Sequence, residues 1–175
     1  QKRRTGNKMQ EKLTKSDIRK IQEEIEYRRL EVRPRLLEEV KETRAHGDLS
    51  ENFEYHAAKR EKNKNESRIR YLERMLRTAQ VIDDSSREDE VGMNNTVEIL
   101  FEEEGTVEEY RIVTSVRGDS LHNLISIESP LGRALLGHRA GDRVEVKVND
   151  SYSYPVVIQK IVNTKDDSGD RIRSY

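Results

Sequence analysis

The stretch SDIRKIQEEIEYRRLEVRPRLLEEVKETRAHGD, residues 16–48, decides the fold. Apolar side chains recur along it at gaps of three, four, seven, four and four residues, at Ile18, Ile21, Ile25, Val32, Leu36 and Val40. This spacing predicts a long helix that buries one face. Pro34 lies inside the stripe, but the stripe continues on both sides of it. We therefore expect a kink in the helix and not its end.

A second apolar stripe follows the short turn His46-Gly47-Asp48, with members at Ala58, Ile69, Leu72, Leu76 and Ala79. Two helices joined by so short a turn should run antiparallel. Each helix would have roughly 28–30 residues, which predicts a hairpin on the order of 40–45 Å long.

The period changes near residue 85, where short β-branched runs cut by Gly, Asn and Asp replace the long charged side chains. Strands are expected at residues 96–101, 107–113, 124–127, 144–148 and 156–162. Ser129 and Pro130 should open a short helix over 131–136, which Gly137 ends. The sequence therefore predicts an α+β protein, in which a helical hairpin precedes a β-rich domain with a short helix.

The changes in composition also predict the limits of each part. Residues 1–8 are expected to be a disordered extension and residues 9–84 the antiparallel coiled coil. An acidic, serine-containing linker should occupy 85–94. The β-rich domain should span 95–163, and a polar, flexible tail 164–175.

The overall composition excludes several classes of protein. Charged residues make up 38% of the chain, the hydrophobic set 33%, and the mean hydropathy is −0.98, which is too polar for one compact sphere. The formal net charge of −1 argues against a uniformly basic nucleic-acid-binding coat. The chain has no cysteine, and none of its apolar runs approaches the roughly 20 residues that span a bilayer. These features favour a cytoplasmic protein with no membrane partner.

Two carboxylates, Asp48 and Glu51, lie three residues apart in the turn between the helices. Side chains at this spacing share one face of a helix. The run D-x-x-E also matches a capping box, and Gly47 suits the end of the preceding helix. Spacing alone leaves open whether the pair caps a helix, performs chemistry or does both.

The run GDLSENFEYHAAK, residues 47–59, resembles the signature of the bacterial Gre family of transcript cleavage factors, and is closer to the GreA than to the GreB branch. Arg33-Pro34 and the run IESPLGRALLG, residues 127–137, also look like Gre segments. The resemblance covers roughly residues 9–163 and touches both halves. Two distant motifs in one chain are a far stronger signal than one short pattern.

The resemblance implies a fold and a mechanism. The C-terminal domain would be similar to FKBP and would dock on bacterial RNA polymerase at the rim of its secondary channel. The coiled coil would enter that channel, and Asp48 and Glu51 would help to hold a second Mg²⁺ at the polymerase's catalytic centre. The polymerase would then cleave the 3′ end of backtracked nascent RNA, so the factor would not be an enzyme itself. With only these two ligands, the free protein, expected as a monomer, should hold no cofactor or metal.

Other residues have supporting or uncertain roles in this interpretation. Ser50 and Asn52 are candidates for orienting water or the tip backbone, and Tyr55 for contacting a nucleotide or the channel wall. A basic run on the second helix is either a solvated face or an RNA contact, and its members are Lys59, Arg60, Lys62, Lys64 and Arg68. An FKBP-like domain suggests a prolyl isomerase, but the sequence predicts no aromatic-lined pocket for that activity.

Two rival functions remain open. A Gre-like inhibitor would plug the channel without promoting cleavage, although the intact GDLSEN run argues against it. A coiled-coil scaffold protein would use Asp48 and Glu51 only as helix caps.

Overall fold

The computed structural model describes residues 10–47, 52–164 and 167–174. The chain forms two compact units, one of residues Ile18–Ala79 and one that combines Gln1–Asp17 with Gln80–Tyr175. The short segment before the first long helix therefore belongs to the same unit as the β-rich part. Within the described ranges, none of the helices has both the length and the apolar character needed to cross a membrane.

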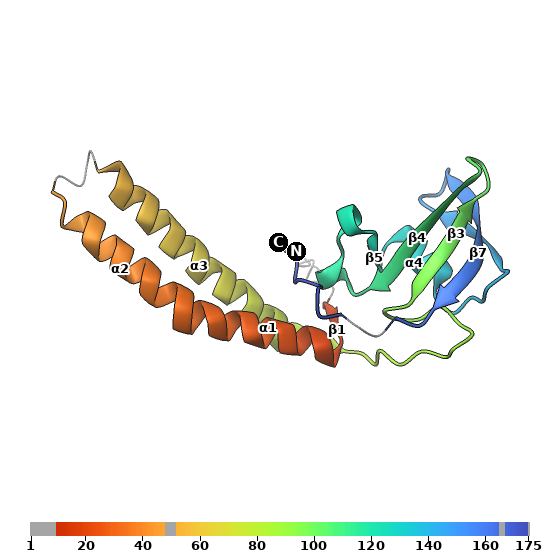
Figure 1. The fold of residues 1–175 in the computed structure, drawn as a ribbon, viewed down its shortest axis with the longest axis horizontal. Coiled ribbons are helices and arrows are strands. Elements are labelled where there is room, and N and C mark those ends of the chain that lie inside the picture. The colour runs from red at the N-terminus through yellow and green to blue at the C-terminus, as the bar shows by residue number, and fades with distance from the viewer. Residues whose placement is uncertain (1–9, 48–51, 165–166, 175) are drawn as a thin grey trace, which may run out of the picture. The chain divides into compact units, whose positions relative to one another are not determined.

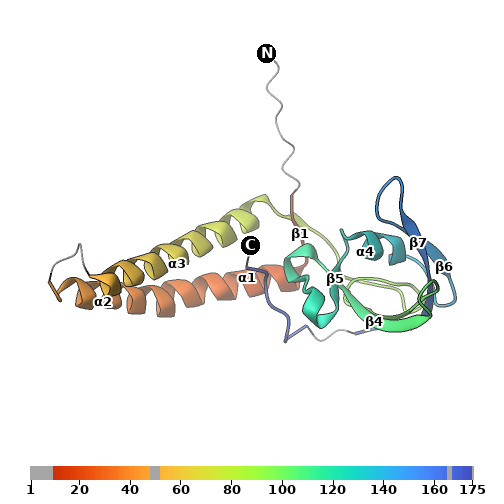
Figure 2. The same cartoon turned by 90° about the horizontal axis from the view of Figure 1, so that it is seen from above.

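The first unit is an antiparallel helical hairpin, as Figures 1 and 2 both show. One arm runs through α1 (Lys15–Tyr27), the π-helical turn η1 (Arg28–Val32) and α2 (Arg33–Arg44), and the other is α3 (Phe53–Thr78). Burial follows the predicted stripes, since the apolar side chains with less than a tenth of their surface exposed are Ile21, Ile25, Leu36, Ala58, Ile69, Leu72 and Met75. The helical hairpin predicted from the sequence is confirmed.

Pro34 is accommodated by the turn that precedes it. A proline inside a helix cannot donate a backbone hydrogen bond, and its ring crowds the carbonyl four residues earlier. Here the backbone N–H of Arg33 bonds the carbonyl of Arg28, five residues back. This wider turn is a π-bulge, a known means of inserting a disruption into an α-helix. The long helix therefore continues through Pro34, as expected.

The second unit is built on a five-stranded sheet with strand order β5-β4-β3-β7-β6. The strands are β3 (Thr96–Phe101), β4 (Thr106–Val113), β5 (Leu124–Ser126), β6 (Arg143–Lys147) and β7 (Ser153–Val162). Neighbouring strands are antiparallel except β4 and β5, which are parallel. All five strands lie at the predicted places, and β7 begins three residues earlier than expected.

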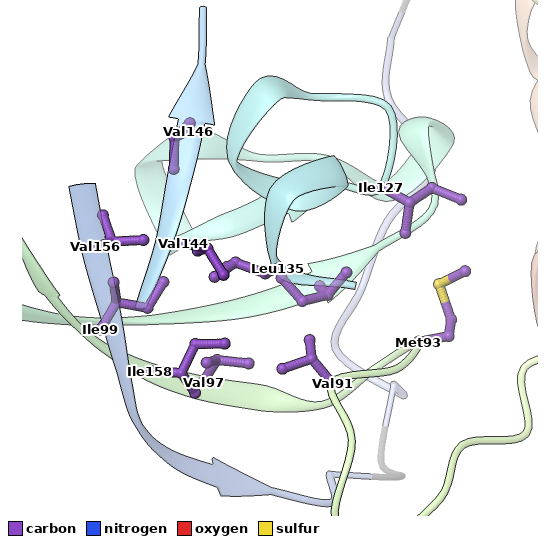
Figure 3. Close-up of a cluster of buried hydrophobic side chains, with 11 residues drawn as sticks. Val91, Met93, Val97, Ile99, Ile127, Leu135, Val144, Val146, Val156 and Ile158 are labelled. Atoms are coloured by element: carbon purple, nitrogen blue, oxygen red, sulfur yellow. The ribbon is translucent and has the colours of Figure 1, made fainter. Parts of the chain in front are cut away.

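Helix α4 (Pro130–Leu135) covers the core of this sheet. Ser129 caps it, because its hydroxyl oxygen accepts a hydrogen bond from the Gly132 N–H at 3.0 Å. Leu135 is fully buried and lies among Val97, Val144 and Ile158, as Figure 3 shows. The short helix and its cap are thus confirmed, and the fold is α+β.

Two segments pack more tightly than the sequence predicts. Val91 and Met93, inside the predicted linker 85–94, belong to the hydrophobic core of the sheet. Residues 167–174 are not a free tail, since Asp170 accepts a hydrogen bond from Arg117 at 2.8 Å and Ile172 is only 9% exposed. Composition misled here because both segments are polar apart from a few anchoring side chains.

A small parallel pair also belongs to this unit. Strand β1 (Lys12–Leu13) pairs with β2 (Gln80–Val81), immediately before α1 and after α3. Leu13 is fully buried. The predicted extension at residues 1–8 lies outside the described residues.

Candidate functional site

Asn52 joins the two helices at the tip of the hairpin. Its side-chain oxygen accepts a hydrogen bond from the Tyr55 N–H at 3.0 Å, which caps α3. Its side-chain nitrogen donates to the Thr43 carbonyl, in the last turn of α2, at 2.6 Å. One amide therefore caps the start of α3 and also bonds the last turn of α2, so it holds the two helix ends together.

Asp48 is not the N-cap of α3, because this helix begins at Phe53 and its N-cap is Asn52. Asn is as good an N-cap as Asp, and the later of the two possible starts is used. Asp48, Ser50 and Glu51 themselves lie outside the described residues. The chain reaches them from Gly47, whose φ of +115° lies in the left-handed region that glycine adopts at little cost.

The first turn of α3 presents a mixed surface. Phe53 is 84% exposed, a large apolar side chain left in solvent. Tyr55 is half-buried, and its ring meets that of His56 edge-on, with 5.4 Å between the ring centroids. The His46 and Glu54 side chains lie 3.6 Å apart across the tip, a contact that no local sequence pattern predicts.

The five basic residues predicted as an RNA contact do not share one environment. Lys59, Arg60 and Lys64 are exposed and Lys62 is half-buried. Arg68 is buried, and its guanidinium makes two hydrogen bonds to Glu24 of the opposite arm, at 2.8 and 3.1 Å. The structure therefore assigns Arg68 to the inside of the hairpin and leaves the other four nearer to the tip.

Arg68 is part of a polar cluster between the arms. Glu24 also accepts a hydrogen bond from Arg28 at 2.7 Å, and Arg28 bonds the side chain of the buried Asn65 at 3.0 Å. Burial by itself would raise the pKa of Glu24, but the hydrogen bonds from Arg68 and Arg28 hold that pKa below its usual value. Glu24 is therefore a carboxylate at neutral pH, and it neutralises two cations inside the seam.

Comparison with known proteins identifies the family of this chain. Residues 11–81 match the family described as "Transcription elongation factor, N-terminal", and residues 86–163 match "Transcription elongation factor, GreA/GreB, C-term". The chain belongs to the GreA/GreB family. It is a transcription elongation factor of the Gre type, as its sequence motifs indicate.

Relatives named as elongation factors match most of this Gre chain. Transcription elongation factor GreA of Thermoanaerobacter pseudethanolicus is 44% identical over 137 residues, which cover 78% of this chain and 87% of the relative. GreA of Brucella anthropi is 41% identical over 152 residues, which cover 86% of this chain and 97% of the relative. The GreA factor homolog 1 (Gfh1) structure from Thermus thermophilus is 28% identical, with a TM-score of 0.41, and the match covers 88% of this chain and 99% of that one.

The described part of this Gre factor contains no group of three or more His, Cys, Asp or Glu side chains placed to hold a metal ion. The chemistry of the tip carboxylates nevertheless suits Mg²⁺, which prefers hard oxygen ligands and commonly takes only one or two carboxylates from a protein. Asp48 and Glu51 are therefore the residues that would contribute to such an ion.

Proposed function

We propose that this chain acts in the bacterial cytoplasm, as a monomer, by inserting its helical hairpin into the secondary channel of RNA polymerase. There it stimulates hydrolytic cleavage of backtracked nascent RNA. The observation that carries this proposal is the tip: Asn52 and Thr43 join the ends of two antiparallel helices, and the segment between them contains Asp48 and Glu51. Membership in the GreA/GreB family supports it.

The dimensions of the hairpin suit delivery of a small group into a narrow space. Helix α3 has 26 residues, which at about 1.5 Å per residue span roughly 39 Å. The two packed helices form a slender hairpin, and the polar cluster around Glu24 and Arg68 joins one helix to the other. The hairpin can therefore hold side chains at its tip, far from its base.

Asp48 and Glu51 would supply oxygen ligands to a centre that the polymerase largely builds. Two-metal hydrolysis of a phosphodiester needs ions about 3.5–4 Å apart, and bound Mg²⁺ supplies water activation and stabilisation of the leaving oxygen. The tip pair would contribute ligands to the second ion, and the polymerase, water and the RNA phosphate would supply the others. The chain is in that case an activator of the polymerase's own chemistry and not an enzyme.

Lys59, Arg60, Lys62 and Lys64 would guide the extruded RNA 3′ segment. They lie in the half of α3 nearer to the tip, and all but Lys62 are exposed. Lysine and arginine on phosphates bind without sequence preference and release counterions, so this contact weakens as salt rises.

A cleavage assay on a stalled, backtracked elongation complex tests the proposal. Asp48→Asn with Glu51→Gln should abolish release of short 3′ RNA products while polymerase still pulls the protein down. Glu54→Gln is the matched control, because Glu54 is another exposed tip carboxylate, on the first turn of α3. Retained cleavage in the double variant would refute the role of the pair.

The same assay separates the rival functions. A channel-plugging inhibitor slows elongation and releases no 3′ products even as the wild-type protein. A scaffold protein fails to bind core polymerase at all. Either result contradicts the proposal, and each does so with a different readout.

A further inference from the structure

Four aromatic side chains gather at one end of the sheet. Phe101 ends β3, Tyr110 lies in β4, Tyr154 lies in β7, and Tyr152 directly precedes β7. Phe101, Tyr110 and Tyr154 each share a sheet face with a core residue two positions along the same strand, because side chains alternate between faces. Phe101, Tyr110 and Tyr154 are partly buried against the hydrophobic core. The cluster thus extends the core face to a place where solvent reaches it.

The rings line a hollow instead of filling it. The Phe101 and Tyr154 rings are stacked with centroids 6.1 Å apart, and Tyr110 meets Phe101 edge-on at 6.2 Å. Tyr152, 52% exposed, lies 6.1 Å from Tyr154 at a tilt. These side chains line a cavity of about 280 Å³. Its size is near the lower limit of about 300 Å³ for small-molecule pockets, so it suits one side chain.

Three carboxylates, from Glu103, Glu104 and Glu108, line the same cavity. All three residues are exposed, and no lysine or arginine within residues 10–47, 52–164 and 167–174 forms an ion pair with them. The adjacent Glu102 differs, because Arg143 donates to both of its carboxylate oxygens at 3.0 Å. The cavity therefore combines aromatic faces with three carboxylates that form no ion pair with a described lysine or arginine.

Tyr110 is held in a neutral, oriented state. Its hydroxyl donates a hydrogen bond to the Glu108 carboxylate. Burial, and then that carboxylate, raise the pKa of Tyr110 to about 12. The phenol is therefore neutral at any physiological pH, and Glu108 lines the cavity beside it.

The chemistry of this lining selects the occupant. Carboxylates repel phosphates, which excludes a nucleic acid, and an apolar ligand would gain nothing from them. A guanidinium stacks on aromatic faces and presents a planar fork of donors to carboxylates, and it is more weakly hydrated than an ammonium. Because the cavity closes around only one side chain, the rest of the ligand must lie on the surrounding surface, as a polypeptide does.

We propose that the cavity lined by Phe101, Tyr110, Tyr152 and Tyr154 is a docking site for an arginine side chain of a partner protein. This site is separate from the hairpin tip, and the inference does not rest on the proposed function. It can be measured on the full chain without polymerase.

NMR titration of the chain labelled in its Phe and Tyr rings tests the proposal, with N-acetyl-arginine amide as the probe. The ring signals of Phe101, Tyr110 and Tyr154 should shift saturably. N-acetyl-norleucine amide, which lacks the charge, should bind at least about fivefold more weakly, the effect expected from one cation–π contact with an ion pair. Equal shifts with norleucine, or no saturable shift with arginine, would overturn the proposal.

Paired variants make the test specific. Glu104→Gln with Glu108→Gln should weaken arginine amide binding by about fivefold or more. Glu88→Gln with Glu109→Gln removes the same charge elsewhere, since both residues are exposed and neither lines the cavity, and should leave binding unchanged. Tyr152→Ala should also weaken binding without unfolding the chain, because Tyr152 is half exposed. If both double variants weaken binding equally, the effect comes from overall charge, and the proposed site is contradicted.

Further probes decide whether the cation belongs to a polypeptide or to a small molecule. A capped Gly-Arg-Gly peptide should bind more tightly than the arginine amide if a polypeptide is the partner. Free arginine or tetramethylammonium that binds more tightly than the peptide would instead identify a small-molecule site and overturn the proposal.

Discussion

Arg117 Nε donates a hydrogen bond to Asp17 Oδ1 at 2.5 Å, and neither side chain has any solvent-accessible surface. The two residues lie 100 positions apart in the sequence. Arg117 also bonds Asn94 at 2.9 Å, and Asp17 accepts a hydrogen bond from the Thr114 hydroxyl at 2.8 Å. This buried pair ties Asp17, in the first turn of α1, into the unit that contains the sheet.

Removing the charge of Asp17 should strongly destabilise this unit. Asp17→Asn keeps the shape of the side chain but removes one of the two carboxylates that bond the buried Arg117 guanidinium, the other being Asp170 at 2.8 Å. Breaking a buried ion pair in this way costs up to about 3–5 kcal/mol. Urea unfolding, followed through NMR signals of core residues such as Ile112 and Ile158, measures the loss. Asp150→Asn, in an exposed turn, is the control and should change the free energy of unfolding by less than about 0.5 kcal/mol. A loss below about 1 kcal/mol for Asp17→Asn would show that the pair contributes little.

Two variants separate the cap that Asn52 provides for Tyr55 from its hydrogen bond to Thr43. Asn52→Ala removes both the cap on Tyr55 and the hydrogen bond to Thr43, and should cost about 0.5–2 kcal/mol. Asn52→Asp keeps an acceptor for the Tyr55 N–H but places an oxygen against the Thr43 carbonyl. Amide exchange at Tyr55 should therefore become about 2- to 30-fold faster in the alanine variant and remain slow in the aspartate variant. Equal exchange in both variants would mean that Asn52 does not cap α3.

Local sequence patterns predicted the elements well, because their causes are local. The apolar stripe through Ile21, Ile25 and Leu36 follows from helical periodicity, and Ser129 with Pro130 opens α4 through hydrogen bonds only three residues long. The tip motif was recognised for the same reason. Helix α3 begins later than the D-x-x-E run suggested, since its N-cap is Asn52, and Asn caps helices as well as Asp does.

Features that join distant parts of the chain could not be predicted. Arg68 looked like a surface cation, because the sequence does not show that Glu24 faces it 44 positions away. Phe101, Tyr110 and Tyr154 come from three strands, so their aromatic cavity exists only once the register is fixed. The same holds for Asp17, which lies in the first turn of α1 and pairs with Arg117, 100 positions away.

The stability of the hairpin should fall in acid through Glu24. The pKa of Glu24 in the folded chain is below its ordinary value of 4.5, so the unfolded chain binds more protons as the pH falls. The stabilisation is complete above pH 4.5 and is lost as the pH falls through the folded pKa. Urea unfolding of the hairpin between neutral pH and acid should show this loss in the wild type and a smaller one in Glu24→Gln. Glu23→Gln, an exposed neighbour, should behave as the wild type. Identical pH profiles for Glu24→Gln and the wild type would refute this.

Gly132 should tolerate no side chain, because α4 lies against the backbone at the end of β5. A Cβ built on Gly132 would be 2.0 Å from the carbonyl oxygen of Ser126, and a backbone atom cannot move aside cheaply. Gly132→Ala should therefore cost about 1–3 kcal/mol, the usual penalty for overpacking. Gly118→Ala is the matched control, since its Cβ would meet nothing closer than 3.4 Å and its φ is −56°. Thermal unfolding of both variants should separate them clearly, with the alanine at 132 lowering the midpoint. If the two midpoints are the same, α4 does not press on Ser126, and the glycine in the run IESPLGRALLG needs another explanation.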